Sequence, residues 1–170
     1  LALGNKALEM ALAAGAKISF DLNVRPQLVT FESARDLYAP FLEAADVIMA
    51  TIEEALRLTG ASNLQGATEM LLGARSDRVI IIHNGERGST VHTASGVEFV
   101  PPFAVEEIDP TDAGDCFDAG FLVRWLEGVT PVEAASFANA CGALAVTARG
   151  PMAGAKMRSE VDTFIQRGKK

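Results

Sequence analysis

Segments rich in β-branched residues alternate with helical patterns along this chain, and that alternation is the feature that most restricts its fold. Residues 78–83 form the clearest expected strand, because four aliphatic residues follow one another there, which is typical of a strand buried on both faces. Helices are expected between the strands, at residues 5–14, 32–44 and 66–75. The expected strands are residues 17–23, 46–50, 78–83, 89–93 and 97–100. Strands separated by helices predict an α/β fold, with a mostly parallel sheet flanked by helices.

The stretch from Asp109 to Asp115 predicts a turn that opens another helix. Apolar residues recur after it at the spacing of one helical face, and Gly128 is placed to end the helix. This face consists of Phe117, Phe121, Leu122, Trp125 and Leu126. The first N–H groups of a helix have no intrahelical acceptor, and the helix dipole makes that end partly positive. Because Ala113 and Gly114 are small, a ligand can approach the backbone, and we expect an anion such as a phosphate to bind there.

Two roles are open for Asp115, which stands in the first turn of this expected helix. An aspartate at such a position often caps the helix by accepting its free N–H groups. A carboxylate beside a phosphate can also accept the proton of an attacking hydroxyl, while the helix amides stabilise the charge of the phosphoryl group in transfer. The residues alone do not decide between these roles.

Composition limits the class of function. With 170 residues, of which 49% are apolar, the chain is expected to form a single domain, residues 1–170, with a sizeable core. The net charge of −7 argues against nucleic acid or an anionic membrane as a partner. Cys116 and Cys141 are too few and too far apart for a metal knuckle or a disulfide framework, so we expect a reducing, cytoplasmic setting. The apolar runs are too short for a transmembrane span.

Two loops that follow expected strands carry candidate binding residues. Asn23 ends the first expected strand and Arg25 follows it, at the position where parallel α/β sheets bind ligands. A solvated surface turn explains these two residues equally well. Thr51 and Glu54 follow the next strand, and their spacing is that of a capping box that opens a helix.

A short loop and an alanine-rich helix carry the remaining candidates. Asn84, Gly85 and Gly88 lie between two expected strands, where a hairpin turn accounts for them fully. Asn139 lies in a helix that we expect to end at Gly150, and almost every other residue of that helix suits a packed core.

The stretch from Asp109 to Asp115 resembles the Asp-Thr-Thr-Gly-Ala-Gly-Asp signature of the PfkB (ribokinase-like) carbohydrate kinases. Two positions depart from it, since Pro110 stands where the family has Thr and Asp112 where it has the first Gly. Other family motifs occur in the same order over most of the 170 residues. The resemblance implies a three-layer ribokinase-like (Rossmann-like) fold. PfkB kinases are longer and the chain begins on Leu1, so we expect the C-terminal half of such a kinase, without the N-terminal part and the lid.

The same resemblance implies an ATP-dependent kinase that phosphorylates a hydroxyl of a sugar or sugar acid, such as a ketohexose or ketodeoxygluconate. Asp115 would be the catalytic base in such an enzyme. The anion hole for the γ-phosphate would consist of Asp112, Ala113 and Gly114. The sugar would be bound by Asn23, Arg25 and Asp115.

The cofactors that the resemblance implies are ATP and Mg²⁺, with K⁺ in some members. Glu54 would hold Mg²⁺ through water, in a motif where Thr51 replaces the family's Asn. Asp109 and Thr111 match positions near a monovalent cation site of some members. The nucleotide-binding residues would be Asn84, Gly85, Gly88 and Asn139.

Two alternatives stay open beside the sugar kinase. One is a non-catalytic homologue that binds a nucleotide or a sugar, in which the changes at Asp112 and Thr51 reflect a loss of catalytic activity. The other is a kinase for a nucleoside or a vitamin. In each case we expect a small-molecule partner, neither nucleic acid nor membrane, and a homodimer as one state of the full-length protein.

Overall fold

The structure, a computed structural model, describes residues 2–151 and 153–168. Within these residues the strands are β1 (Ser19–Asp21), β2 (Val47–Thr51), β3 (Val79–His83), β4 (Ser89–Thr93) and β5 (Gly96–Val100). The helices are α1 (Ala2–Ala13), α2 (Phe31–Ala44), α3 (Ile52–Thr59), α4 (Leu64–Leu72), the 3₁₀ turn η1 (Gly85–Arg87), α5 (Ala113–Leu126), α6 (Pro131–Ala145) and α7 (Arg158–Gly168). No helix among the described residues is long and apolar enough to cross a membrane.

The described strands form one sheet in the order β1-β2-β3-β4-β5. β1 and β2 pair in parallel, with Phe20 opposite Ile48. A helix connects β1 to β2, and two helices connect β2 to β3, which are crossovers of the kind that parallel neighbours need. Short loops join β3 to β4 and β4 to β5, as in antiparallel hairpins. The sheet is therefore mixed, and the predicted α/β fold class is confirmed.

The chain divides into two compact units. The first unit contains the residues up to Ile82 together with His92–Val97, and the second contains His83–Val91 together with the residues from Glu98 onward. The predicted boundaries of one domain, residues 1–170, stay a prediction.

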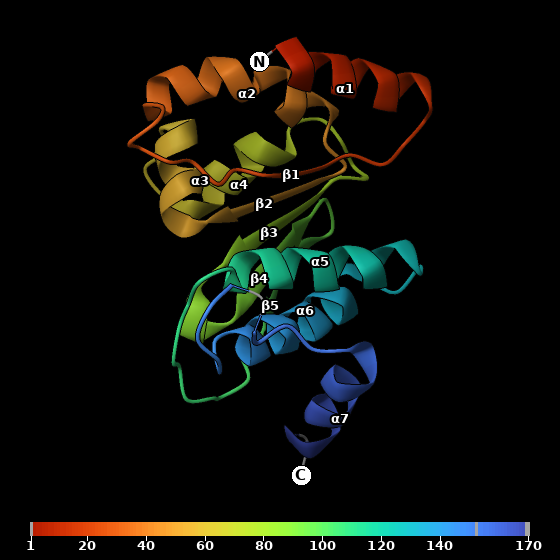
Figure 1. Cartoon of the computed structure of the whole chain (residues 1–170). Helices are drawn as coiled ribbons and strands as arrows, with labels where there is room; N and C mark the ends of the chain where they lie inside the picture. The colour runs from red at the N-terminus through yellow and green to blue at the C-terminus, as the bar shows by residue number, and fades with distance from the viewer. Residues whose placement is uncertain (1, 152, 169–170) are drawn as a thin grey trace. The chain divides into compact units, whose positions relative to one another are not determined.

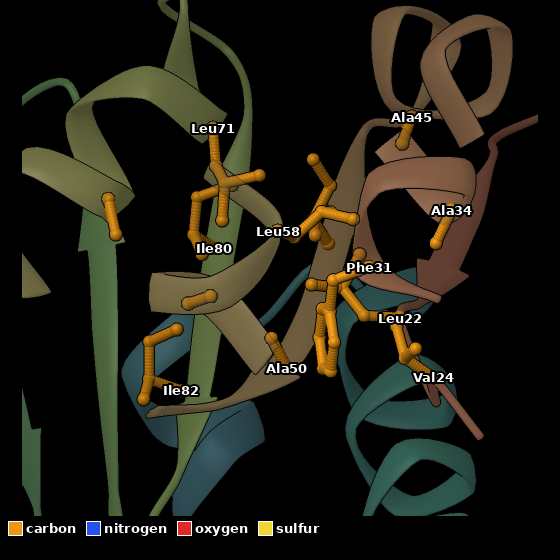
Figure 2. Packing of buried hydrophobic residues seen from close by; sticks show 13 residues of the cluster. Leu22, Val24, Phe31, Ala34, Ala45, Ala50, Leu58, Leu71, Ile80 and Ile82 are labelled. Atoms are coloured by element: carbon orange, nitrogen blue, oxygen red, sulfur yellow. The ribbon is translucent and has the colours of Figure 1, made fainter. Parts of the chain in front are cut away.

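The core of the first unit is a cluster of mostly aliphatic side chains, with Phe31 as the one aromatic residue among its buried members (Figure 2). It draws on the segment that follows β1, on β2 and β3, and on the helices α2, α3 and α4. Its buried members are Leu22, Val24, Phe31, Ala34, Ala45, Ile48, Ala50, Ala55, Leu58, Ala67, Leu71, Ile80 and Ile82. Burial of this much apolar surface is the main force that stabilises the unit.

A second, polar cluster in the first unit is centred on Asp46. Its carboxylate accepts hydrogen bonds from the backbone N–H of Ile18 at 2.8 Å, from Arg75 at 2.8 Å and from Lys17 at 3.1 Å. Arg78 is also buried, and its guanidinium donates to the carbonyl oxygens of Ala45 and other residues. Asp46 is thus paired with Arg75 and Lys17, and the Arg78 guanidinium donates to carbonyl oxygens, and these contacts offset part of the cost of burying the charges.

The second unit is built around α5 and α6, which pack side by side (Figure 1). Phe117 and Phe121 of the predicted α5 face are buried, whereas Leu126 is exposed. A Cβ atom on Gly120 would lie 2.7 Å from Sγ of Cys141, so only glycine allows this close approach of the two helices.

Several helix ends differ from the prediction, and the structure gives the reason for two of them. α4 begins at Leu64 rather than at residue 66, because the side chain of Asn63 accepts the N–H of Gly66 and caps an earlier turn. α6 ends at Ala145 and does not continue to Gly150. Its next carbonyl, that of Val146, instead accepts the backbone N–H groups of residues 108 and 109, at 2.8 and 3.1 Å. A contact with a distant segment therefore ended the helix.

Candidate active site

Asp109 fixes the turn that precedes α5. Its Oδ1 accepts the backbone N–H and the hydroxyl of Thr111, at 3.0 and 2.6 Å, and its Oδ2 accepts the N–H of Gly150 at 2.9 Å. These hydrogen bonds hold the pKa of Asp109 below its ordinary value, and the bond from the Thr111 side chain has the largest effect. Asp109 is therefore an anion at neutral pH, and it anchors the turn to the segment that follows α6.

Asp112 is the N-cap residue of α5 and has a left-handed backbone, with φ 58° and ψ 16°. Glycine adopts this conformation without cost, and aspartate is one of the few other residues that tolerate it. The Asp112 side chain caps no N–H group of α5, unlike a typical N-cap aspartate. The chain therefore keeps the backbone shape that suits a glycine, although it carries a carboxylate at this position.

Asp115 is the third residue of α5 and is exposed. The N–H of Ala113 donates to the carbonyl of Pro110 at 3.3 Å. The N–H groups of Gly114 and Asp115 belong to the first turn, where a helix offers no backbone acceptor. An exposed carboxylate thus lies next to helix-end amides that are suited to an anion.

The loop between β3 and β4 contains two glycines that are needed for different reasons. The N–H of Asn84 donates to the carbonyl of Gly88 at 2.9 Å, which closes the loop. Gly85 has a φ of +54° and open space around it. Gly88 has a φ of +85°, and a Cβ atom there would lie 2.3 Å from the carbonyl oxygen of Val100. Packing, as well as backbone conformation, therefore requires glycine at residue 88.

Asn139 of α6 is buried and contacts the same segment as Gly88. Its Nδ2 donates to the carbonyl oxygens of Val100 and Pro101, at 3.2 and 3.0 Å. Asn139 thus fixes the chain just after β5. Its predicted place beside the adenine base stays a prediction.

Asn23 and Arg25 lie in the loop that follows β1, in the first unit. Both are exposed, while Leu22 and Val24 next to them are buried in the core (Figure 2). Asn23 has a φ of +36°, a region in which asparagine is enriched among non-glycine residues. The two buried residues therefore anchor the loop while the two polar side chains remain available to a ligand.

Glu54 lies at the start of α3 and joins that helix to the same loop. Its Oε2 accepts the N–H and hydroxyl of Thr51, at 2.9 and 2.8 Å, and this confirms the predicted capping box. Its Oε1 accepts the N–H of Val24 at 2.8 Å. The second contact brings Glu54 beside Asn23 and Arg25, a proximity that local sequence spacing does not reveal.

The sequence analysis missed His83 and Asp118. His83 ends β3 and Asp118 lies in α5, with 3.4 Å between Nε2 and Oδ1. A polar residue that ends an aliphatic strand, and a carboxylate one helical turn after Asp115, are the only sequence signals of this contact. Among residues 2–151 and 153–168, no group of three or more His, Cys, Asp or Glu side chains is arranged to hold a metal ion.

Comparison with known proteins identifies the family. Residues 1–157 match the pfkB family of carbohydrate kinases. The chain belongs to this family. It is 31% identical to the probable fructokinase-4 of Arabidopsis thaliana over 169 residues, which are 95% of this chain and 52% of that protein. It thus spans about half the length of the curated relatives that it matches, as the resemblance to a PfkB C-terminal half implies.

Two solved kinase structures are similar to this chain in fold. One is an E. coli protein assigned as ribokinase II, in complex with ATP and Mg²⁺, with a TM-score of 0.87 and 37% identity over 96% of this chain and 53% of that one. The other is the aminoimidazole riboside kinase of Salmonella enterica, complexed with aminoimidazole riboside and an ATP analogue. Its TM-score is 0.81, with 31% identity over 94% of this chain and 56% of that one.

Proposed function

We propose that the full-length protein transfers the γ-phosphoryl group of ATP to a hydroxyl of a sugar or sugar acid, with Asp115 as the general base. The observation that carries the proposal is the start of α5, where the exposed Asp115 carboxylate lies beside first-turn N–H groups. Membership of the PfkB family supports the same chemistry.

In this mechanism Asp115 accepts the proton of the attacking hydroxyl. The N–H groups at residues 112–115, chiefly those of Gly114 and Asp115, stabilise the negative charge of the transferred phosphoryl group at the positive end of the helix dipole. Asp112 serves this anion hole through its backbone, since its left-handed conformation gives the turn its shape.

The nucleotide is assigned to the second unit and Mg²⁺ to Glu54. Asn84, Gly85 and Gly88 supply a compact loop for the nucleotide, and Asn139 fixes the segment that Gly88 contacts. Oε2 of Glu54 already accepts two hydrogen bonds and Oε1 accepts one, so a second lone pair of Oε1 remains for a water molecule. Glu54 therefore fits a magnesium ion held through water. Bound Mg²⁺ would neutralise charge on the phosphates.

Asp109 and Thr111 are assigned to a monovalent cation such as K⁺, through oxygens that also hold the turn together. We assign Asn23 and Arg25 to the acceptor. A guanidinium pairs well with a carboxylate or phosphate group, so Arg25 favours acidic or phosphorylated sugars. The cytoplasmic location and the homodimer stay predictions.

A riboside is the second candidate acceptor, because one solved relative is complexed with aminoimidazole riboside. The test is a screen of the full-length protein with Mg·ATP and a panel of sugars, sugar acids and ribosides, with ADP release as the readout. We expect ADP formation that depends on one acceptor class. Tight ATP binding without transfer to any acceptor would instead favour the non-catalytic alternative.

A further inference from the structure

One polar contact of the second unit has no part in the proposed phosphoryl transfer. Nε2 of His83 lies 3.4 Å from Oδ1 of Asp118, and the two side chains are only 18% and 16% exposed. The His83 ring also packs on Phe117, with 4.4 Å between ring centroids. Two adjacent residues of α5 thus contact the last residue of β3. An interaction between polar groups is stronger in such a partly buried setting than at the surface, because water screens it less.

The contact joins two segments that the proposed function uses. His83 directly precedes Asn84, the first residue of the loop assigned to the nucleotide. Asp118 follows Asp115 by three residues, so the two carboxylates lie one turn apart on the same helix. A shift of His83 relative to α5 would therefore change the distance between the nucleotide loop and the anion hole.

We infer that His83 and Asp118 are positioning residues for the nucleotide. They touch no reacting atom, but they set the separation between the loop at residues 84–88 and the N-terminal turn of α5. A bound nucleotide must contact both segments at once if its γ-phosphate is to reach the amides of Gly114 and Asp115. Displacements of about 1 Å lower rates strongly in such sites. The inference rests on the proposed function.

Kinetics of the full-length protein test this role. In Asp118→Asn and in His83→Gln we expect a higher KM for ATP and a lower kcat, with kcat/KM for ATP reduced about tenfold. The KM for the acceptor should not change. The double variant should be no worse than either single variant, because both remove one shared contact. Additive losses, or equal effects on both substrates, would overturn the inference.

Asp162→Asn is the matched control for Asp118→Asn. Asp162 lies in α7, is half exposed and is 3.9 Å from Arg158, so its loss should change neither KM nor kcat. A decrease in kcat/KM for ATP that is as large in this control as in Asp118→Asn would show that the effect is not specific to the contact, and would also overturn the inference.

A binding measurement on the unmodified protein covers the case in which a variant fails to fold. The chain has two histidines, and the imidazole nitrogens of both can be followed by NMR during titration with Mg·ADP. We expect the His83 signal to shift in parallel with the amides of Gly85 and Gly88. The signal of His92, which is buried in β4, should stay in place. If the amides shift and His83 does not, the inference is wrong. If no signal shifts at all, the proposed function itself fails.

Discussion

The two units differ in how they use aspartate. In the first unit, Asp46 is 6% exposed, and its partners include the backbone N–H of Ile18 and Arg75. In the second unit, Asp115 is exposed at a helix start, and Asp112 has a left-handed backbone with no capping hydrogen bond. A buried and fully paired carboxylate stabilises the fold. A carboxylate at a helix start gains only a small stabilisation from the helix dipole, so the role that we propose for Asp115 is functional rather than structural.

The largest effect should come from Asp115→Asn, which separates activity from stability. The amide keeps the shape of the side chain but cannot accept a proton, so kcat of the full-length enzyme should decrease by roughly 10²–10⁴-fold. Nucleotide affinity should hold or increase because a negative charge is lost. The stability should change by less than about 1 kcal/mol. Asp36→Asn, at an exposed site in α2, is the control. Unchanged turnover in Asp115→Asn would remove this residue from the base role.

Asp46→Asn should lower stability strongly, in contrast to Asp115→Asn, which should lower activity. Asp46 is buried while Arg75 and Lys17 are 32% and 57% exposed, so removal of its charge should lower the free energy of unfolding in denaturant by about 2–4 kcal/mol. Asp77→Asn is the matched control, because Asp77 pairs with the same Arg75 while its side chain is 60% exposed. Its loss should cost less than about 1 kcal/mol. Equal losses in the two variants would contradict the contrast between buried and exposed pairs.

The contribution of Asp46 to the stability of the fold should also depend on pH. Burial alone would raise the pKa of Asp46, but the Ile18 N–H, Arg75 and Lys17 outweigh it and hold the pKa below its ordinary value. The stabilisation is therefore complete above the unfolded pKa of about 3.9 and is lost as pH falls through the lower folded pKa. We expect the difference in Tm between the wild type and Asp46→Asn to narrow as pH decreases below about 4.

Gly88→Ala and Gly85→Ala should separate close packing from backbone conformation. Both positions have a positive φ, which costs alanine roughly 1–2 kcal/mol. Only at Gly88 would the new Cβ meet backbone atoms, with the carbonyl oxygen of Val100 at 2.3 Å. Gly88→Ala should therefore destabilise the protein by about 2–4 kcal/mol in denaturant unfolding, and clearly more than Gly85→Ala. Equal losses of stability in the two variants would mean that the segment after β5 moves to accommodate the new Cβ atom at little cost.

Asp112→Gly should have the smallest effect. Glycine relieves the left-handed backbone, but its greater freedom in the unfolded chain offsets that gain, so stability should change by less than about 1 kcal/mol. The kcat/KM for ATP should change by less than about tenfold. Asp112→Ala is the control, since it keeps the positive φ without glycine's freedom. A much larger gain in activity from Asp112→Gly would show that the natural protein is impaired, and would favour the non-catalytic alternative.

Local rules predicted much of this protein because the residues they involve are close in sequence. The capping box of Thr51 and Glu54 spans a single turn, and both its hydrogen bonds occur in the structure. A second capping box of the same spacing, at Thr130 and Glu133, opens α6. The strand at residues 78–83 followed from its aliphatic run, since few other structures bury such a run completely. The fold class and the turn at Asp109 depend on signals of this local kind.

Tertiary structure decided whatever depends on residues far apart in the chain. α6 ends at Ala145 because the carbonyl of Val146 accepts N–H groups from residues 108 and 109. Glu54 lies beside the Asn23 loop through a hydrogen bond to Val24, thirty residues away. His83 and Asp118 lie 35 positions apart in the sequence, and their side chains meet only in the folded second unit. Spacing along a sequence encodes the helix and strand periods, but it carries no distance between separate elements, so these contacts appear only once the packing of the core has fixed them.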